Sequence, residues 1–378
     1  MRDYHHAKPA DVLHVATVTS SDMDEFFTIV STNVHRLFSR VTNGNTKTHT
    51  CKEDSMPNHI KFATDLVTFY APEYWGGRGD MSDLEAVLAA NGWDALRFWE
   101  RILTDVKTAG LDGIEITFTP GNWQSAIAAY GSAHGFAQAL ASHKLELCSG
   151  YLSNRIPGTE RYADIANRAD HGVLTEMADN YAEFLATCQS DTMVISLPLR
   201  KSLLADQPLF VDAQSAQTIA DALNRIGYMT RKRGVKLALH PEAFSMFRNS
   251  RDVDLFMLYT DPSYVHLCPD TAQFVVAGSN PLDIVARHRD RVVITHWKDA
   301  TGPAPLDIPI DESIYDTQVQ WFAAVGQGVV DWPAWTRLLR DINYQGWAVF
   351  ELDAARNPVS DLQQIMSYVK GSLAHIYR

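Results

Sequence analysis

YVHLCPD (residues 264–270), PLDIVARHR (281–289) and VVITHW (292–297) follow one another as a short β-rich run, a helical run and a second β-rich run. The two short runs are apolar through most of their length, and each brings a polar side chain to its end, Asp270 and His296. Buried parallel strands have such apolar runs, and the connection between two of them usually contains a helix. The stretch therefore predicts one strand–helix–strand unit with reactive side chains at the strand ends.

The same alternation occurs eight times from Ile60 onward. The predicted strands lie within residues 60–70, 113–118, 145–151, 192–199, 235–240, 264–270, 292–297 and 347–352. The helical patterns that follow them lie within residues 93–110, 125–143, 166–188, 213–234, 250–260, 281–289, 332–342 and 359–377. Eight such units predict an α/β fold, the (β/α)8 TIM barrel. An open doubly wound sheet is the competing topology, but no GxGxxG follows the first predicted strand to support its dinucleotide-binding form.

The first part of the chain has a different composition. Residues 1–55 are rich in Thr, Ser, Asn and His, and apolar residues recur at three- and four-residue steps between Phe27 and Val41. That spacing predicts an amphipathic helix, and the polar stretch before Met56 predicts a linker. We therefore expect an N-terminal helical extension over residues 1–55 and a barrel over residues 56–378, with Met56 as an alternative start.

Composition excludes several classes of protein. The 378 residues are 46% hydrophobic and 21% charged, as in globular proteins, and the net charge of -12 disfavours binding to nucleic acid or to an anionic membrane surface. No apolar run approaches the roughly 18 residues that cross a bilayer, and the N-terminus lacks the apolar core of a signal peptide. Four cysteines without CxxC spacing indicate neither a disulfide framework nor a thiolate zinc site. We expect a cytoplasmic protein whose partner is a small molecule.

Polar side chains stand at the ends of the last four predicted strands. In a barrel of this type the active site lies at the C-terminal ends of the strands. The metal-competent side chains there are His240, Glu242, Asp270, His296 and Glu351. Carboxylate oxygens and imidazole nitrogens without a thiolate favour Mn²⁺, Co²⁺, Mg²⁺ or Zn²⁺. A single strand-end His or Asp is more often a capping or hydrogen-bonded group, so the prediction depends on finding all of them together.

Three motifs carry a family resemblance: GVKLALHPE (234–242), CPDTAQFVVAGSNPLDIVARHRDRVVITHWKDA (268–300), and VGQGVVDWPAW (325–335) followed by GWAVFELD (346–353). Over about residues 58–376 the sequence resembles the xylose isomerase-like barrel superfamily of sugar isomerases, epimerases and inosose dehydratases. The resemblance implies one metal ligand at each of four strand ends, which by position are His240, Asp270, His296 and Glu351.

The sequence departs from the family pattern at the predicted site. The first ligand of the family is usually Glu, whereas the matching residue here is His240, with Glu242 two residues on and able to face the same side. Either one could be the ligand. The histidine that is common in the family three residues after the aspartate is Gln273 here, which leaves the transfer of acid and base roles open.

A divalent ion at these strand ends would polarise a substrate carbonyl and stabilise an enediolate. Glu242 is the candidate base if His240 is the ligand, Glu351 could serve as both ligand and proton acceptor, and Lys298 is the candidate acid or oxyanion partner. The candidate substrate-binding residues are Glu115, Trp75, Gln273 and Trp297. For Glu115 an ion pair inside the barrel is the alternative.

Three functions remain open at this point. The segment DTAQFVVAGSNPLDIVARHRDR with HWKDA is most similar to inosose dehydratases, which implies β-elimination from a keto-sugar, a 3-keto-glycoside or a keto-cyclitol. A ketose isomerase or epimerase would use the same metal and the same enediolate. A barrel that has lost catalysis and acts as a binding subunit is the third reading. The resemblance also implies a homo-oligomer.

Overall fold

The structure, a computed structural model, describes residues 60–202 and 209–377. The predicted N-terminal extension, residues 1–55, lies outside the described residues. Within them the barrel strands are β1 (Lys61–Asp65), β2 (Gly113–Ile116), β3 (Glu146–Tyr151), β4 (Thr192–Ser196), β5 (Lys236–His240), β6 (Val265–Leu267), β7 (Thr295–Trp297) and β10 (Trp347–Phe350). A two-stranded antiparallel sheet, β8 (Asp299–Ala300) and β9 (Phe322–Ala323), follows β7.

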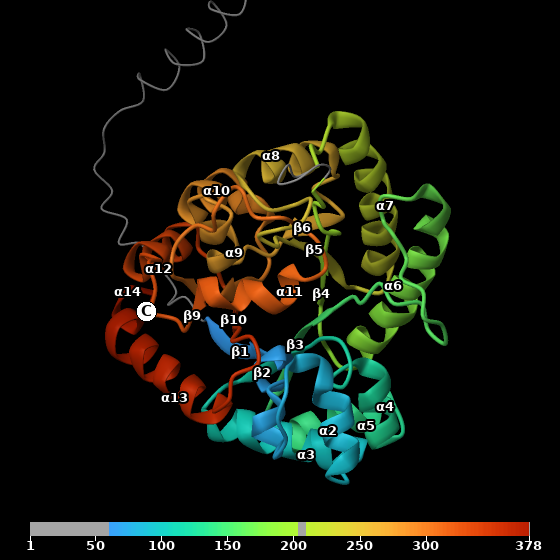
Figure 1. The fold of residues 1–378 in the computed structure, drawn as a ribbon, viewed down its shortest axis with the longest axis vertical. Coiled ribbons are helices and arrows are strands. Elements are labelled where there is room, and N and C mark those ends of the chain that lie inside the picture. The colour runs from blue at the N-terminus through green and yellow to red at the C-terminus, as the bar shows by residue number, and fades with distance from the viewer. Residues whose placement is uncertain (1–59, 203–208, 378) are drawn as a thin grey trace, which may run out of the picture. The chain divides into compact units, whose positions relative to one another are not determined.

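The eight barrel strands form one parallel sheet in the order β6-β5-β4-β3-β2-β1-β10-β7. Two parallel bridges, Leu267 with Val292 and Asp270 with His296, connect the two ends of this order and close the ring. The eight predicted strands and the predicted (β/α)8 barrel are therefore confirmed (Figure 1).

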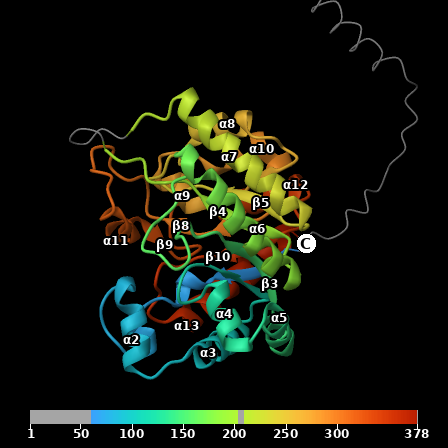
Figure 2. The ribbon, with the colours of Figure 1, turned by 90° about the vertical axis from the view of Figure 1, so that its right-hand side faces the viewer.

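Helices follow the strands and surround them (Figure 1, Figure 2). They are α2 (Leu84–Ala90), α3 (Ala95–Thr108), α4 (Trp123–Tyr130), α5 (Ala133–Ser142), α6 (His171–Thr187), α7 (Ala213–Lys232), α8 (Ser250–Tyr259), α9 (Thr271–Val276), α10 (Pro281–His288), α11 (Ile314–Thr317), α12 (Trp332–Asp341), α13 (Pro358–Tyr368) and α14 (Ala374–Tyr377). None of the helices in the described part of the chain is long and apolar enough to cross a membrane.

The helix predicted over residues 125–143 occurs as two, α4 and α5. Gly131 ends α4 with a φ of 77°, a left-handed conformation that glycine adopts without steric cost. Ser132 then begins α5, because its side chain accepts a hydrogen bond from the backbone N–H of Gly135. The prediction of one continuous helix was wrong, and a glycine followed by a capping serine is the reason.

The inside of the barrel has an apolar layer below a polar one. The apolar layer consists of Ala63, Cys148, Val194, Ala238, Cys268, Ile294 and Val349. Side chains two residues apart on a strand point to the same face. Two residues past six of these positions stand Asp65, Ser196, His240, Asp270, His296 and Glu351. Glu115 joins them because it pairs in register with Asp65. The fold therefore gathers polar side chains directly above an apolar floor.

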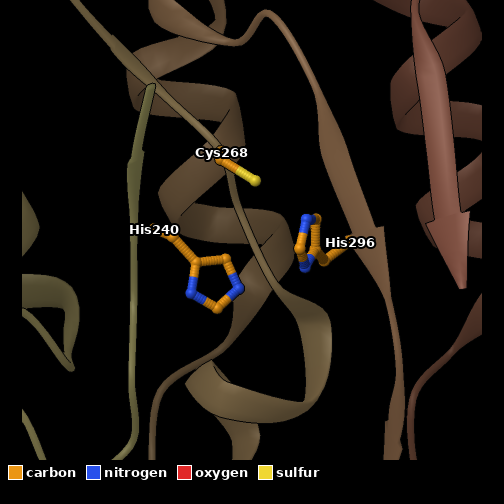
Figure 3. Close-up of side chains that lie close together, drawn as sticks. All are labelled: His240, Cys268 and His296. Atoms are coloured by element: carbon orange, nitrogen blue, oxygen red, sulfur yellow. The ribbon is translucent and has the colours of Figure 1, made fainter. Parts of the chain in front are cut away.

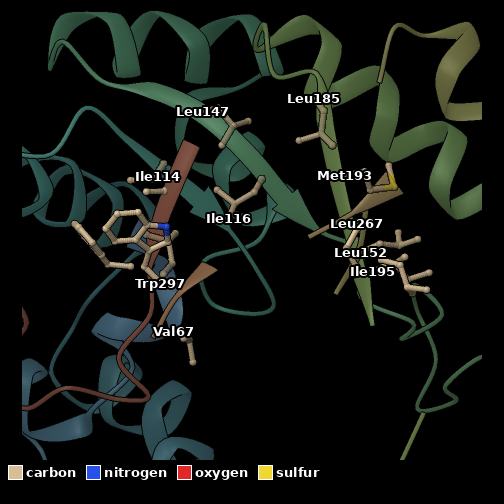
Figure 4. Close-up of a cluster of buried hydrophobic side chains, with 14 of the residues drawn as sticks. Val67, Ile114, Ile116, Leu147, Leu152, Leu185, Met193, Ile195, Leu267 and Trp297 are labelled. Carbon is tan, nitrogen blue, oxygen red and sulfur yellow. The ribbon is translucent and has the colours of Figure 1, made fainter. Parts of the chain in front are cut away.

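The outer faces of the strands pack against the helices (Figure 4). Ile114 and Ile116 flank Glu115 on β2 and belong to this core, as strand alternation requires. Trp297 follows the inward His296 and also lies in this core. It is fully buried, with its ring 5.1 Å from that of Trp332. The predicted substrate contact of Trp297 does not match this position, because its side chain faces the helices and not the inside of the barrel.

Candidate metal centre

Four side chains meet at the C-terminal ends of β5, β6, β7 and β10. His240, Asp270, His296 and Glu351 each place one ligand atom within 4.8 Å of the others. Asp270 is fully buried, His240 and His296 are nearly so, and the Glu351 side chain is 11% exposed. The structure therefore brings together the four residues that the family resemblance indicated.

Three atoms in this group have no hydrogen-bond partner. They are Nε2 of His240, Nε2 of His296 and Oδ2 of Asp270, and all three are buried. Nε2 of His240 lies 3.8 Å from Oδ2 of Asp270, and Nε2 of His296 lies 3.1 Å from Oε1 of Glu115, but neither contact is a hydrogen bond. A buried polar atom without a partner costs about 1–3 kcal/mol, so native proteins rarely leave several of them side by side. A divalent cation accepts lone pairs from imidazole nitrogens and carboxylate oxygens. The donor set and its orphaned atoms fit such a cation.

The charges of the group depend on one another. Burial disfavours a charged imidazole, but Asp270 and Glu242 outweigh it and raise the pKa of His240 well above its usual value. Burial also opposes ionisation of Glu351, yet Lys298 and His296 hold the pKa of that carboxyl well below its usual range. The neighbouring carboxylates thus draw a proton onto the His240 imidazole. A bound cation would replace that proton, since a metal ligand must be deprotonated.

Glu242 stands beside this group rather than in it. Its Oε1 accepts a hydrogen bond from Oγ of Ser196 at 3.1 Å, and its Oε2 accepts one from Nε2 of Gln273 at 3.0 Å. Gln273 in turn accepts a hydrogen bond from the backbone N–H of Ala243 at 2.7 Å. The oxygen and the nitrogen of the Gln273 amide therefore both form hydrogen bonds with protein atoms. The bond from the nitrogen orients the Glu242 carboxylate. The Glu242 side chain is 25% exposed.

Lys298 is buried against the opposite side of Glu351. Its Nζ donates to Oε1 of Glu351 at 2.7 Å and to Oδ2 of Asp353 at 2.8 Å, and it lies 3.8 Å from the centre of the Phe322 ring. Burial would favour the neutral amine, but the two carboxylates raise the pKa of Lys298 above its usual value. A lysine held in its charged form suits an oxyanion partner better than a proton donor. Burial raises the pKa of Asp353 to about 6.

Two residues that sequence reasoning missed lie at the same site. Asp65, at the end of β1, lines the cavity, and burial and Glu115 raise its pKa well above the usual value. Cys268 lies within 4.8 Å of ligand atoms of His240 and His296, and Figure 3 shows its thiol beside the two imidazoles. The available signal was position: Cys268 precedes Asp270 by two residues on the same strand face.

Of the remaining predicted residues, Glu115 lines the cavity and Trp75 does not. Glu115 is fully buried, and its Oε1 lies 3.1 Å from Nε2 of His296, so it takes part in an ion pair inside the barrel. Trp75 is 2% exposed, donates to the carbonyl oxygen of Phe69 and stacks on Phe98. Trp75 is not among the residues that line the cavity, so the structure does not bring it to the site as expected.

A cavity of about 350 Å³ opens above the four-residue group. This volume lies within the range of about 300–1,000 Å³ for small-molecule sites. Polar and aromatic side chains line it. The lining includes Asp65, Glu115, Phe118, Tyr151, Tyr162, Ser196, His240, Glu242, Gln273, His296, Lys298, Tyr315, Glu351 and Asp353. We name this space the strand-end cavity.

Known proteins resemble this chain in sequence and fold. An inosose dehydratase of Lacticaseibacillus casei is 28% identical over 181 residues, 46% of this chain and 60% of that protein. An inosose dehydratase of Bacillus licheniformis is 29% identical over 263 residues, 67% of this chain and 80% of that protein. This chain thus matches only about 60% of the length of the Lacticaseibacillus casei protein.

A solved structure extends the likeness in fold. An IolI protein with a bound zinc atom has a TM-score of 0.56 and 15% identity, covering 82% of this chain and 98% of that one. At this identity the likeness concerns the fold alone. Residues 103–371 match the family described as xylose isomerase-like TIM barrel, which is more than half of the chain. This chain therefore belongs to the xylose isomerase-like TIM barrel family.

Proposed function

We propose that this chain is a divalent-metal-dependent lyase. It removes a β-substituent from a keto-sugar, a 3-keto-glycoside or a keto-cyclitol through an enediolate. The observation that carries the proposal is the convergence of His240, Asp270, His296 and Glu351 beside the strand-end cavity, with three buried atoms that make no hydrogen bond. The matching relatives, which are inosose dehydratases, support elimination as the reaction.

The metal would be held by these four side chains. When bound, a divalent ion supplies a Lewis acid that polarises a carbonyl and an adjacent hydroxyl. A set of imidazoles and carboxylates suits Mn²⁺, Co²⁺, Mg²⁺ or Zn²⁺. The neighbouring fold with a bound zinc atom supports Zn²⁺ among them. In this assignment His240 is the fifth-strand ligand, and Glu242 is free for another role.

Glu242 is the base in this proposal. Its carboxylate lines the cavity beside the four-residue group, and Ser196 and Gln273 hold its two oxygens in place. A general base must be fixed within hydrogen-bonding reach of the proton that it removes, and these two contacts supply that orientation. Glu242 would take the proton from the carbon next to the substrate carbonyl. Lys298, kept charged by its two carboxylates, would stabilise negative charge on a substrate oxygen.

The test is a substrate panel in D₂O. Keto-inositols, 3-keto-glycosides and ketoses are incubated with the protein under defined Mn²⁺, Co²⁺, Mg²⁺ or Zn²⁺ and followed by NMR. The proposal predicts an enone or its hydrate. Deuterated starting material or its epimer, with no eliminated product, would identify an isomerase or epimerase and refute the lyase. Protein that contains no metal and is unaffected by chelator would argue against an enzyme and for a binding subunit.

A further inference from the structure

A second cavity adjoins the strand-end cavity. Its volume is about 590 Å³, larger than the first, and it lies among the loops after β2 and β3 and the helix α6. Four residues line both spaces, namely Thr117, Phe118, Tyr151 and Ser153. We name this space the side cavity. The two cavities are therefore neighbours, and a ligand that occupied both would pass along these four residues.

The lining of the side cavity fits a neutral ring. Trp123 offers a partly exposed indole whose ring stacks on that of Tyr181, with centroids 5.9 Å apart and planes 26° apart. Met177 adds apolar surface, and Asn180 contributes an exposed amide that makes no hydrogen bond within residues 60–202 and 209–377. Apolar walls with a few polar groups are typical of small-molecule sites.

The charged residues of the side cavity neutralise each other. Arg155 donates to both carboxylate oxygens of Glu160 at 3.0 Å. The two side chains are 45% and 94% exposed, and as the charged residues of the lining they give it no net charge. The loop that carries the pair is built into the fold, since Arg155 forms a bridge with Tyr162 and Asn154 donates to the carbonyl oxygen of Ala163 at 2.9 Å. The side cavity therefore favours an uncharged occupant.

We infer that the substrate is a 3-keto-glycoside in two parts. Its keto-sugar ring occupies the strand-end cavity, and its leaving group, an uncharged sugar or aryl ring, occupies the side cavity. The inference rests on the proposed function, because elimination requires the leaving group to be attached next to the carbon that loses its proton. A keto-cyclitol, which would expel only water, would leave the side cavity without an occupant.

The reaction balances without an oxidant or reductant. The base takes the proton from C2, which lies between the C3 carbonyl and C1. The electron pair of the C2–H bond becomes the second bond between C1 and C2. The pair of the C1–O bond leaves with the aglycone oxygen, which takes up a proton. The products are a 2-hydroxy enone and a free alcohol.

The experiment compares leaving groups of two sizes in two variants. Asn180→Trp places a large side chain in the side cavity, and Ala186→Trp, exposed on the same helix and outside the cavity lining, is its matched control. The probes are the methyl and the benzyl 3-keto-β-glucosides, whose alcohols have similar acidity and therefore leave with similar ease. Wild type and Ala186→Trp should prefer the benzyl compound in kcat/KM by roughly tenfold or more. Asn180→Trp should abolish that preference, because it slows the benzyl compound more than the methyl compound.

Equal kcat/KM for both probes in wild type, or equal slowing of both by Asn180→Trp, would overturn the inference. A binding measurement separates this result from failure of the proposed function. Benzyl β-glucoside, which has no keto group to react, is titrated calorimetrically into wild type and Asn180→Trp. If no compound undergoes elimination but only wild type binds this probe, the proposed reaction is refuted and the side cavity is still supported as a ring-binding site. Equal affinity in both proteins would overturn the side cavity as a ring-binding site.

Discussion

Three orphaned atoms distinguish this end of the barrel from an ordinary network of ion pairs. A network that served stability alone would give Nε2 of His240, Nε2 of His296 and Oδ2 of Asp270 hydrogen bonds, because a buried polar atom without one costs about 1–3 kcal/mol. Their ion-pair contacts, at 3.8 Å and 3.1 Å, do not supply them. The surrounding side chains are by contrast well satisfied, as Glu242 and Lys298 show. At the scale of the residue, the pattern of satisfied and unsatisfied atoms therefore separates the proposed ligands from the groups around them.

Glu242 should be required for the reaction and not for metal binding. Glu242→Gln keeps the shape of the side chain but removes the base, so turnover should fall by about 10²–10⁴-fold. Metal content should remain that of wild type. The measurement is kcat with the best compound of the panel, together with elemental analysis of the protein. Glu85→Gln, a change at an exposed helical position outside the cavity, is the control and should be neutral. Loss of the metal from Glu242→Gln would make Glu242 a ligand and contradict the assignment.

Lys298 should contribute to stability as well as to activity. Lys298→Met leaves Glu351 and Asp353 facing each other without their shared cation, and breaking a buried pair in this way costs about 3–5 kcal/mol. Denaturation by urea in the presence of chelator measures the effect on metal-free protein. The double variant Lys298→Met/Asp353→Asn should recover part of the loss, since one charge fewer is left unpaired. If Lys298→Met is as stable as wild type, water already solvates the ion pairs of Lys298 with Glu351 and Asp353, and this prediction is contradicted.

The sequence predicts the polar strand ends well and the aromatic residues poorly. His240, Asp270, His296 and Glu351 follow from strand ends and family position, and the structure gathers them. The aromatic expectations depended on loop position alone, which does not tell on which side a ring packs. Trp297 is instructive because strand alternation already requires it to face away from its neighbour His296. The same rule of two residues would have found Asp65 and Cys268.

One carboxylate organises the element that follows β7. Asp299 accepts hydrogen bonds from the backbone N–H groups of Gly326, Gly328 and Val330 and from Nε1 of Trp332. It is fully buried. A Cβ on Gly328 would lie 2.3 Å from Asp299 Oδ1, so only glycine fits this close approach. These contacts fix the segment behind β9, whose Phe322 ring lies against Lys298.

Replacing this carboxylate should loosen the element. Asp299→Ala removes the acceptor of four hydrogen bonds from this segment, and bonds to a charged group contribute about 1.5–3 kcal/mol each, so the free energy of unfolding should fall by at least about 3 kcal/mol. Hydrogen exchange should also increase at residues 324–332. The control is Asp316→Ala, an exposed residue on α11. Wild-type stability and exchange in Asp299→Ala would contradict this role.

The sequence predicts which strands and helices occur more reliably than it predicts the residues at which they end. All eight strand–helix units appear, because apolar runs and helical periodicity recur together along the chain. The first predicted strand, residues 60–70, ends at Asp65, whose side chain accepts from the backbone N–H of Val67 and begins a 3-10 helix. A capping contact of this kind depends on local geometry that an apolar pattern does not contain.

The stability of the whole molecule should depend on His266. Burial, with Arg291 nearby, lowers its pKa to about 4, and its Nδ1 has no hydrogen-bond partner. Between pH 6.5 and 4 the unfolded chain then binds more protons than the folded one, so the free energy of unfolding falls as the pH falls through this range. The loss should be about 1–2 kcal/mol, since His266 is partly exposed and screened.

His266→Gln should be less sensitive to acid than wild type. The measurement is urea denaturation of both proteins at pH 7, 5.5 and 4.5. The difference between their free energies of unfolding should shift in favour of the variant as the pH falls, while other titrating groups affect both proteins alike. A difference that stays constant with pH would mean that His266 is not held neutral by the fold.

The closed barrel is the part of the molecule that the sequence predicts best, because eight repeated units and parallel strands leave few alternatives. The side cavity was not predicted, since its walls come from the loops after β2 and β3 and from one face of α6, and the sequence pattern does not show how these pack together. The predicted helix and linker of residues 1–55 stay a prediction.

The central claim is that four strand ends of this barrel hold one divalent ion. Calorimetric titration of Zn²⁺ and Mn²⁺ into chelator-treated protein tests it most directly, with wild type, Asp270→Ala and Glu242→Gln compared at one pH. The account predicts one ion per chain in wild type and in Glu242→Gln, and no binding at this site in Asp270→Ala. Wild-type protein that binds neither ion, or Asp270→Ala that binds as wild type does, would contradict it.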